Sequence, residues 1–307
     1  IDTSGIMPSC YRTEDFTRYN ILHALIDYFL GVDFFNLGLD EEDLGIITPY
    51  RAQAKLLRKI YADFGREKTI CSTVHRFQGR EKAAIFFDTT DSYPEKVGYL
   101  LQGNLDSDGG KVINVAITRA KHYLGLISHL EYMKRNAKEH SQIKDVLDMI
   151  AAGQNIKKAH EYFPRELRSV IDRGFDRKFV KIGEVYIEFF VNSGTDKVFS
   201  NLFATSVNER LLLFPMIRRE DEELVIDLCK VPPKEKAART LVISGRFPNS
   251  IFLSKIRELG AEHIEAKIAN RSLIVDKNSI VIFDIGRCVD GQPFGAVLYN
   301  APNTIEE

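Results

Sequence analysis

The sequence predicts an α/β fold for the first half of the chain, with helices covering a parallel sheet. Three apolar, β-rich runs, at residues 44–48, 83–87 and 123–127, have the length and composition of buried strands. Two segments, 14–30 and 51–64, carry apolar residues at helical spacing and alternate with these runs. Because strands that alternate with helices usually pair in parallel, we expect one sheet with helices on its faces.

Local signals mark where these elements end. The first helix is expected to stop at Gly31, since glycine is favoured at helix C-termini. The strand at 44–48 meets Pro49, which disfavours a helical residue before it and indicates a turn. The second helix is closed by Gly65. Parallel sheets bind ligands at the carboxyl ends of their strands, so we expect the functional residues of all three strand ends to gather there.

The rest of the chain is expected to form a polar connection and a second α/β domain. Residues 151–181 contain eight Lys or Arg and four acidic residues. This composition is typical of solvated helices that link two domains, with a surface facing nucleic acid as the alternative. Strands return from residue 182, and 271–276 with 280–284 are typical of a hairpin. The predicted division is a first domain, a basic helical linker and a second domain, at residues 1–135, 136–181 and 182–307.

Composition narrows the class of protein. The net charge of −1 gives no overall basic signature, so nucleic-acid binding would rest on a local groove. The four cysteines lie far apart, as in an intracellular protein with reduced thiols, and we expect a cytoplasmic location with the nucleus as the alternative. Neither they nor the seven histidines have metal-ligand spacing, so no metal site is predicted. No apolar run approaches the roughly 20 residues that span a bilayer, so no membrane partner is expected.

Three blocks follow one another in the order of a known family. Residues 112–127 contain Asn-Val-Ala-Ile-Thr-Arg-Ala-Lys before an apolar strand and resemble motif VI of superfamily 1 helicases. Residues 45–53, with Thr-Pro-Tyr-Arg, and 72–88, with Phe-Gln-Gly-Arg-Glu, resemble motifs IV and V. Two shorter matches support the same family, Asp2-Thr3-Ser4-Gly5 and Gly98-Tyr99-Leu100. The resemblance is closest to the branch of the nonsense-mediated-decay and replication-nuclease helicases, and it implies the second RecA-like domain.

Arg119, in the motif VI block, is the predicted catalytic residue. Cleavage of the γ-phosphate of ATP needs positive charge where negative charge develops, and a guanidinium presents a planar fork of donors to phosphate oxygens. The resemblance implies that this arginine reaches ATP and Mg²⁺ held mainly by the first RecA-like domain of the same polypeptide. Arg51 and Tyr50 are expected to face the nucleotide too. The alternatives are solvent exposure for Arg51 and packing within its own domain for Tyr50.

The motif V block extends the predicted contacts. Glycine at position 79 allows close backbone approach to a phosphate or ribose, and Glu81 could accept a hydrogen bond from a ribose hydroxyl. The ATP-binding set implied by the resemblance is completed by Gln78. Hydroxyl and imidazole groups suit contacts to a nucleic-acid backbone, which carry no sequence information. The residues expected to contact a single strand of DNA or RNA are Thr48, Thr73 and His75. Many relatives in this branch have Asp where His75 stands, which weakens the subfamily assignment.

The elements that would hold ATP are missing from the sequence. It contains no Gly-x-x-x-x-Gly-Lys-Ser/Thr, and no Asp-Glu pair follows an apolar strand. The chain opens with Ile in the middle of a motif, so we expect a fragment of a longer ATP-dependent helicase that does not hydrolyse ATP by itself. The alternative is a non-catalytic nucleic-acid-binding or assembly module that kept the RecA-like fold.

Residues 240–284 resemble part of a phospholipase-D-like nuclease domain. They share a helix that closes with Leu259-Gly260-Ala261, followed by a hairpin. When the usual His-x-Lys-x-x-x-x-Asp pattern is aligned on Asp276, Ala269 replaces the histidine and Arg271 the lysine. That chemistry needs a histidine nucleophile, so we expect a degenerate domain used for binding or assembly, or an unrelated α/β module. An active nuclease is the weakest of these hypotheses.

Overall fold

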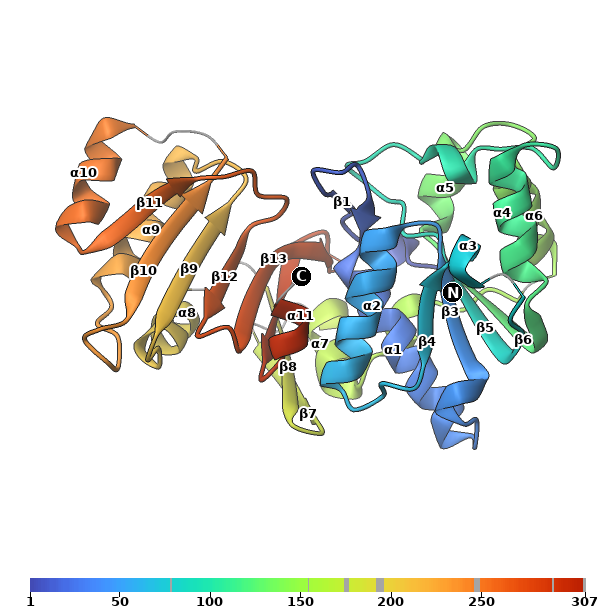
Figure 1. Ribbon diagram of the computed structural model, residues 1–307, viewed down its shortest axis with the longest axis horizontal. Helices are drawn as coiled ribbons and strands as arrows, with labels where there is room; N and C mark the ends of the chain where they lie inside the picture. The colour runs from blue at the N-terminus through green and yellow to red at the C-terminus, as the bar shows by residue number, and fades with distance from the viewer. Residues whose placement is uncertain are drawn as a thin grey trace.

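The computed structural model describes residues 1–305 except 78, 154, 174–176, 192–195, 246–248 and 289. Two α/β parts lie side by side, each built around its own sheet (Figure 1). The predicted mixed α/β class is therefore confirmed. No described helix is long and apolar enough to cross a membrane.

The first sheet has four strands in the order β4-β3-β5-β6, all parallel to their neighbours. Its strands are β3 (Leu44–Thr48), β4 (Ile70–Thr73), β5 (Lys82–Asp88) and β6 (Ala120–Ile127). Alternate residues along these strands face different cores. Ile46 and Phe86 pack with α1 (Ile21–Asn36) and α2 (Arg51–Asp63), whereas Ile47 and Phe87 pack with α4 (Asp108–Ile117) and the helices after it. This layered parallel sheet confirms the predicted RecA-like architecture.

Helices cover both faces of this sheet. They are α1 (Ile21–Asn36), α2 (Arg51–Asp63), α3 (Val74–Phe77), α4 (Asp108–Ile117), α5 (Leu130–Asn136) and α6 (Gln142–Ala152). The first helix begins later than expected, because Asn20 caps it by accepting a hydrogen bond from the His23 N–H, and a short hairpin precedes it, β1 (Tyr11–Arg12) with β2 (Arg18–Tyr19). The predicted stop at Gly31 is wrong: a side-chain carbon there would lie 2.6 Å from the Tyr61 hydroxyl, so this glycine lets α1 and α2 pack closely.

The second sheet has eight strands in the order β11-β10-β9-β12-β13-β14-β8-β7. Their bounds are β7 (Arg177–Ile182), β8 (Val185–Val191), β9 (Glu209–Phe214), β10 (Arg239–Ser244), β11 (Ala261–Glu265), β12 (Ser272–Val275), β13 (Ser279–Arg287) and β14 (Pro293–Tyr299). Strands β9 to β11 are parallel and the rest pair antiparallel. The predicted hairpin is confirmed as β12 with β13. One face carries a core with α8 (Asp196–Ala204), α9 (Arg219–Lys230) and α10 (Ser250–Glu258).

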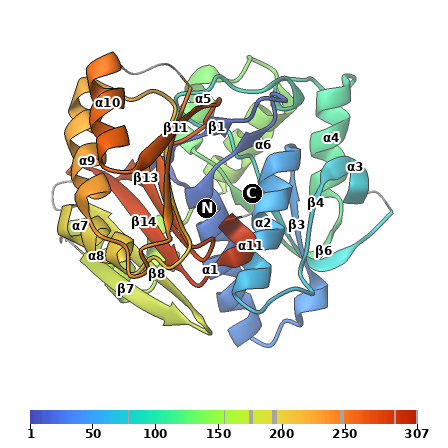
Figure 2. The same cartoon turned by 60° about the vertical axis from the view of Figure 1, so that its left-hand side comes forward.

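The two parts share one apolar core. Buried residues of α1 pack in the same cluster as residues of β8, β14 and α7 (Arg165–Arg173). The segment predicted as a solvated linker therefore contributes buried side chains, Leu167, Val170 and Ile171, through one face of α7. The last helix, α11 (Pro302–Ile305), returns to the first part, where the Asp63 carboxylate accepts four hydrogen bonds from Asn303 and Thr304 (Figure 2).

Candidate functional site

The predicted site residues lie on two opposite edges of the first sheet. Thr48 ends β3 and Thr73 ends β4, at the carboxyl edge. Arg119 directly precedes β6, and Glu81 directly precedes β5, at the amino edge. The expectation that all these residues gather at carboxyl ends is wrong. The helix α3 carries the chain back along the sheet to Phe77, which packs over Gly45 near the start of β3, and α4 carries it back before Arg119. We call these two surfaces the amino edge and the carboxyl edge.

At the amino edge, the loop after α3 lies beside Arg119. The backbone N–H of Lys82 donates to the Arg119 carbonyl at 3.1 Å, and Lys82 faces Ala120 in the strand pairing. Glu81 and Arg119 therefore belong to adjacent backbone segments. Gly79 has a φ of +77°, and no atom of the described residues lies within 4 Å of where a side-chain carbon would stand, so its backbone is open to approach. Gln78 lies outside the described residues.

The Arg119 side chain has a hydrogen-bonding group without an internal partner. Its Nε is buried, and no atom of the described residues accepts a hydrogen bond from it. Burying a charged donor without a partner is costly, and native proteins usually satisfy such groups. Among the described residues Arg119 is also in no ion pair, unlike Arg18 and Arg51 at the carboxyl edge. Arg119 as a whole is only half-buried, so part of its side chain is accessible to an anion from outside the chain.

Tyr50 and Arg51 lie at the carboxyl edge, away from Arg119. The Tyr50 hydroxyl donates to Asp91 Oδ2 at 2.8 Å, and Arg18 donates to Asp91 Oδ1 at 2.6 Å. Arg51 is exposed and pairs with Asp15 on the loop before β2. The structure thus gives Tyr50 a partner within its own domain, and it does not bring either residue to the amino edge. Sequence analysis missed Arg18 and Asp91, whose relation depends on contacts between distant segments.

The three residues predicted to contact nucleic acid differ in accessibility. Thr48 is fully buried; its hydroxyl lies 2.9 Å from that of Thr90 and accepts a hydrogen bond from the Tyr50 N–H at 3.3 Å. Thr73 is half-buried and His75 is exposed. Only Thr73 and His75 of these three therefore present side-chain atoms to the solvent at the carboxyl edge.

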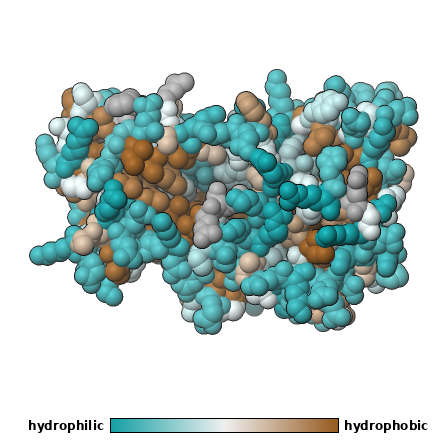
Figure 3. Space-filling view, in the orientation of Figure 1, coloured by the Kyte–Doolittle hydropathy of each residue, from teal (hydrophilic) through white to brown (hydrophobic). Residues whose placement is uncertain are grey.

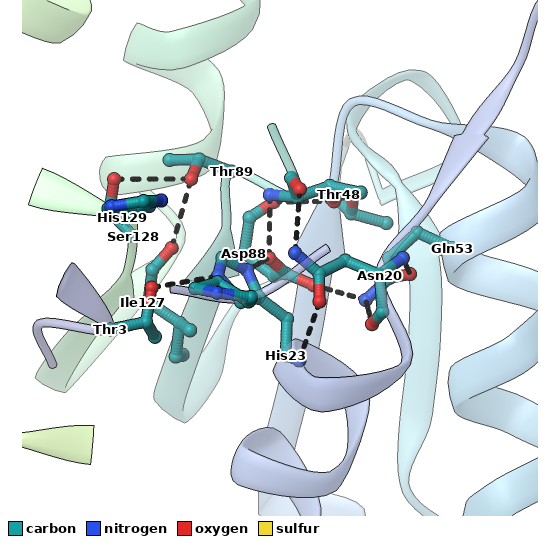
Figure 4. Close-up of polar contacts among 12 residues, drawn as sticks. Thr3, Asn20, His23, Thr48, Gln53, Asp88, Thr89, Ile127, Ser128 and His129 are labelled. Carbon is teal, nitrogen blue, oxygen red and sulfur yellow. Dashed lines mark hydrogen bonds and ion pairs between the residues drawn. The ribbon is translucent and has the colours of Figure 1, made fainter. Parts of the chain in front are cut away.

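A buried polar network lies beneath the carboxyl edge (Figure 4). Asp88, at the end of β5, is 2.7 Å from His23 Nδ1 and accepts a hydrogen bond from Gln53 Nε2 at 2.6 Å. The second ring nitrogen of His23 lies 3.1 Å from the Thr3 hydroxyl. Thr3, His23 and Asp88 are arranged like a hydrolase triad, but all have 0% exposure, so no substrate reaches them. The network instead joins α1 and α2 to β5. No spacing in the sequence indicated it.

Asp27 adds a second carboxyl group to this buried region. It has 0% exposure, and neither of its carboxyl oxygens has a hydrogen-bond partner among the described residues. Burial, and next the negative charge of Asp88, raise the pKa of Asp27 well above its usual value. Asp27 therefore holds a proton in the folded protein at a pH where the unfolded chain releases it.

We expect Asp27→Asn to stabilise the protein more at pH 8 than at pH 5. Because the folded pKa lies above the unfolded value near 4, wild-type stability falls as the pH rises through the range between the two pKa values. Asparagine is neutral at every pH, so it avoids this loss. Urea unfolding of both proteins at the two pH values measures the effect. A stability difference that does not change with pH would contradict the assignment.

An apolar cavity of about 450 Å³ lies between the two parts of the chain. It is lined by α2 and by the hairpin of β12 and β13, and Figure 3 shows the apolar side chains gathered in this hollow. Ala269, which replaces the histidine of the phospholipase-D-like pattern, lines it. Arg271 pairs with Asp221 at 3.3 Å, and Asp276 accepts three backbone N–H groups, from Val207, Asn208 and Glu209. These residues thus have internal partners, and the nuclease-like resemblance stays a prediction.

The four-stranded parallel sheet and its two polar edges place the first part of the chain among RecA-like α/β domains. A family model described as an AAA domain matches residues 14–131. The DNA replication ATP-dependent helicase/nuclease DNA2 of Mus musculus is 32% identical over 129 residues. The DNA polymerase alpha-associated DNA helicase A and the helicase sen1, both of Schizosaccharomyces pombe, are 35% and 33% identical over 154 and 151 residues. Residues 14–131 are a domain of the superfamily 1 helicase family.

These similarities cover part of each protein. They span 42%, 48% and 47% of this chain, but only 12%, 22% and 8% of the DNA2, helicase A and sen1 proteins. The solved structure of a phosphatidylserine synthase from Haemophilus influenzae overlaps 56% of this chain and 45% of its own, with 9% identity and a TM-score of 0.25. An overlap at that level supports no conclusion.

Proposed function

We propose that this chain is the part of an ATP-dependent superfamily 1 helicase that completes the ATP site and carries one side of the nucleic-acid track. Arg119 would bind the γ-phosphate of ATP held by another RecA-like domain, and Gly79 and Glu81 would contact the nucleotide beside it. The observation that supports this best is that the half-buried Arg119 has no ion-pair partner among the described residues and lies in a segment hydrogen-bonded to the backbone next to Glu81.

ATP would supply the cleavable phosphate, and the residues of this chain would supply position and charge. A guanidinium from a second domain can reach the phosphate only when the two domains close, so hydrolysis becomes tied to their movement. Among the described residues, no three His, Cys, Asp or Glu side chains are grouped as metal ligands. As the family resemblance implies, Mg²⁺ would be held mainly by the domain that holds the phosphates.

The carboxyl edge would carry single-stranded DNA or RNA. Thr73 and His75 are accessible there and lie on a different edge of the sheet from Arg119. Separate edges let one domain contact the strand and the nucleotide at the same time. The relatives named as DNA helicases favour DNA as the first substrate to test.

The alternative is a non-catalytic nucleic-acid-binding or assembly module. It is favoured by one observation, the lack of a Gly-x-x-x-x-Gly-Lys-Ser/Thr segment in this sequence. In that case the RecA-like fold would serve binding alone.

The deciding measurement is the ATPase activity of the full-length protein that contains this chain, with and without single-stranded DNA or RNA. We expect the strand to stimulate turnover, and we expect the 307-residue chain alone to be inactive. The better stimulator would identify the substrate. No turnover in the full-length protein would contradict the helicase proposal and support the binding module.

A further inference from the structure

Three aromatic rings are strongly exposed near the carboxyl edge. Phe16 is 74% exposed, Tyr93 70% and Tyr99 75%, whereas the rings in the core of the same part of the chain, such as Phe86, are buried. Phe16 lies on the turn between β1 and β2, and the two tyrosines lie in the connection that follows β5. Exposed apolar side chains that lie close together often mark a binding surface, and these three rings come from loops at the same edge of the sheet.

The loops that carry these rings are fastened to one another. The Cys10 N–H donates to the Tyr93 carbonyl at 2.9 Å, which joins the β1 segment to the loop after β5. The Arg12 guanidinium lies 5.5 Å from the centre of the Phe16 ring and pairs with Glu95 at 3.7 Å. The rings thus project from loops whose backbone positions are linked.

Asp91 fixes the backbone next to the third ring, Tyr99, to the same group of loops. Its carboxylate accepts the Gly98 N–H at 2.7 Å, and Tyr99 follows directly. The same carboxylate also accepts hydrogen bonds from the Arg18 guanidinium and the Tyr50 hydroxyl. Asp91 has 0% exposure, so this anchor is buried beneath the loops, while the Tyr99 side chain remains exposed. A fixed backbone with exposed rings reduces the ordering cost of binding a flexible ligand.

The charges of this surface are largely balanced. Arg12, Arg18 and Arg51 pair with Glu95, Asp91 and Asp15 respectively. Within the described part of the chain, Lys96 on the same loop has no ion-pair partner and is exposed. The surface therefore offers ring faces with little net charge. Exposed ring faces fit the bases of a single strand, which are free to stack on them, better than those of a duplex, which are already stacked on one another.

We propose that Phe16, Tyr93 and Tyr99 form a stacking platform for the bases of single-stranded nucleic acid. This inference rests on the proposed function, since it takes the strand to cross the carboxyl edge. The platform adds base contacts to the backbone contacts assigned to Thr73 and His75. Stacking accepts any base, so the platform would bind single strands of any sequence in preference to duplexes.

The test uses fluorescence anisotropy of the 307-residue chain with labelled strands of thymidine, of uridine and of abasic residues, all of one length. We expect Tyr93→Ala, Tyr99→Ala and Phe16→Ala each to weaken binding of the base-containing strands by about 5- to 150-fold, the range for loss of one stacked base. Tyr93→Phe should bind normally, because it keeps the ring. Binding of the abasic strand should not change.

Phe179→Ala is the matched control, since this ring is 64% exposed but lies on β7 of the second sheet. Normal binding by all three alanine variants would overturn the platform and leave the helicase proposal intact. Equal weakening of binding to abasic and base-containing strands would also overturn the platform, because the rings would then contact the sugar-phosphate backbone and not the bases. If the wild-type chain binds no single strand, the platform is excluded. The helicase proposal is then tested separately, by measuring the ATPase activity of the full-length protein.

Discussion

Replacing Arg119 with alanine is expected to lower ATP hydrolysis by the full-length protein by about 10³- to 10⁵-fold, the range for an arginine that stabilises a phosphoryl-transfer transition state. The physical reason is loss of the only positive charge that this chain would place on the γ-phosphate. Binding of single strands should be retained, because Arg119 lies at the amino edge and the strand is assigned to the carboxyl edge. Steady-state ATPase assays and strand anisotropy measure the two quantities on the same preparation.

Two control variants make this result specific. Arg51→Ala removes an exposed arginine of the opposite edge, already paired with Asp15, and should change turnover far less. Arg119→Lys keeps the charge but loses the planar fork of donors, so it should restore little activity. The Arg119 side chain has no hydrogen bond to the described residues from its Nε, so its removal should leave the unfolding temperature nearly unchanged.

An unchanged turnover in Arg119→Ala would remove the central assignment. Loss of activity in Arg51→Ala alone would mean that the nucleotide lies at the carboxyl edge. The single-stranded nucleic acid would then have to bind elsewhere, and the proposal that Thr73 and His75 contact it would be wrong.

The sequence was most informative where a local pattern determines the structure. Apolar runs that end at polar turns identified three strands of the first sheet, and Pro49 correctly marked the end of β3. The hairpin of β12 and β13 was equally visible, because its apolar residues have a turn between them. The resemblance of the three blocks to helicase motifs also identified the family of residues 14–131.

Contacts between segments that are distant in the sequence could not be predicted from local patterns. Gly31 looks like a helix stop in sequence, and only the approach of Tyr61 from α2 explains why a glycine lies inside α1. The edge on which Arg119 lies depends on how α4 returns along the sheet before β6. The network of His23, Gln53 and Asp88 joins three segments, and each of these residues alone looks like an ordinary polar residue.

Asp88→Ala is expected to destabilise the folded protein by at least about 3 kcal/mol, since leaving one buried donor without its acceptor costs about 1–3 kcal/mol. The change leaves three donors without their acceptor inside the protein: His23 Nδ1, Gln53 Nε2 and the Thr90 N–H. Loss of the Asp88 charge also removes one of the causes that raise the pKa of Asp27, which offsets part of this cost. Urea unfolding followed by circular dichroism at neutral pH measures the difference.

Asp15→Ala is the matched control, because it also removes an aspartate that accepts a hydrogen bond, but an exposed one with 62% of its side chain accessible. It should change stability by no more than about 1 kcal/mol. Equal effects of the two variants would contradict the structural role of the buried network. If Asp88→Ala is the more damaging, the same network explains how the carboxyl edge keeps its shape. Asp88 accepts the Thr90 N–H and Asp91 comes next in the chain, so the residue that fastens α1 and α2 to β5 also fixes the start of the loop that carries Tyr93 and Tyr99.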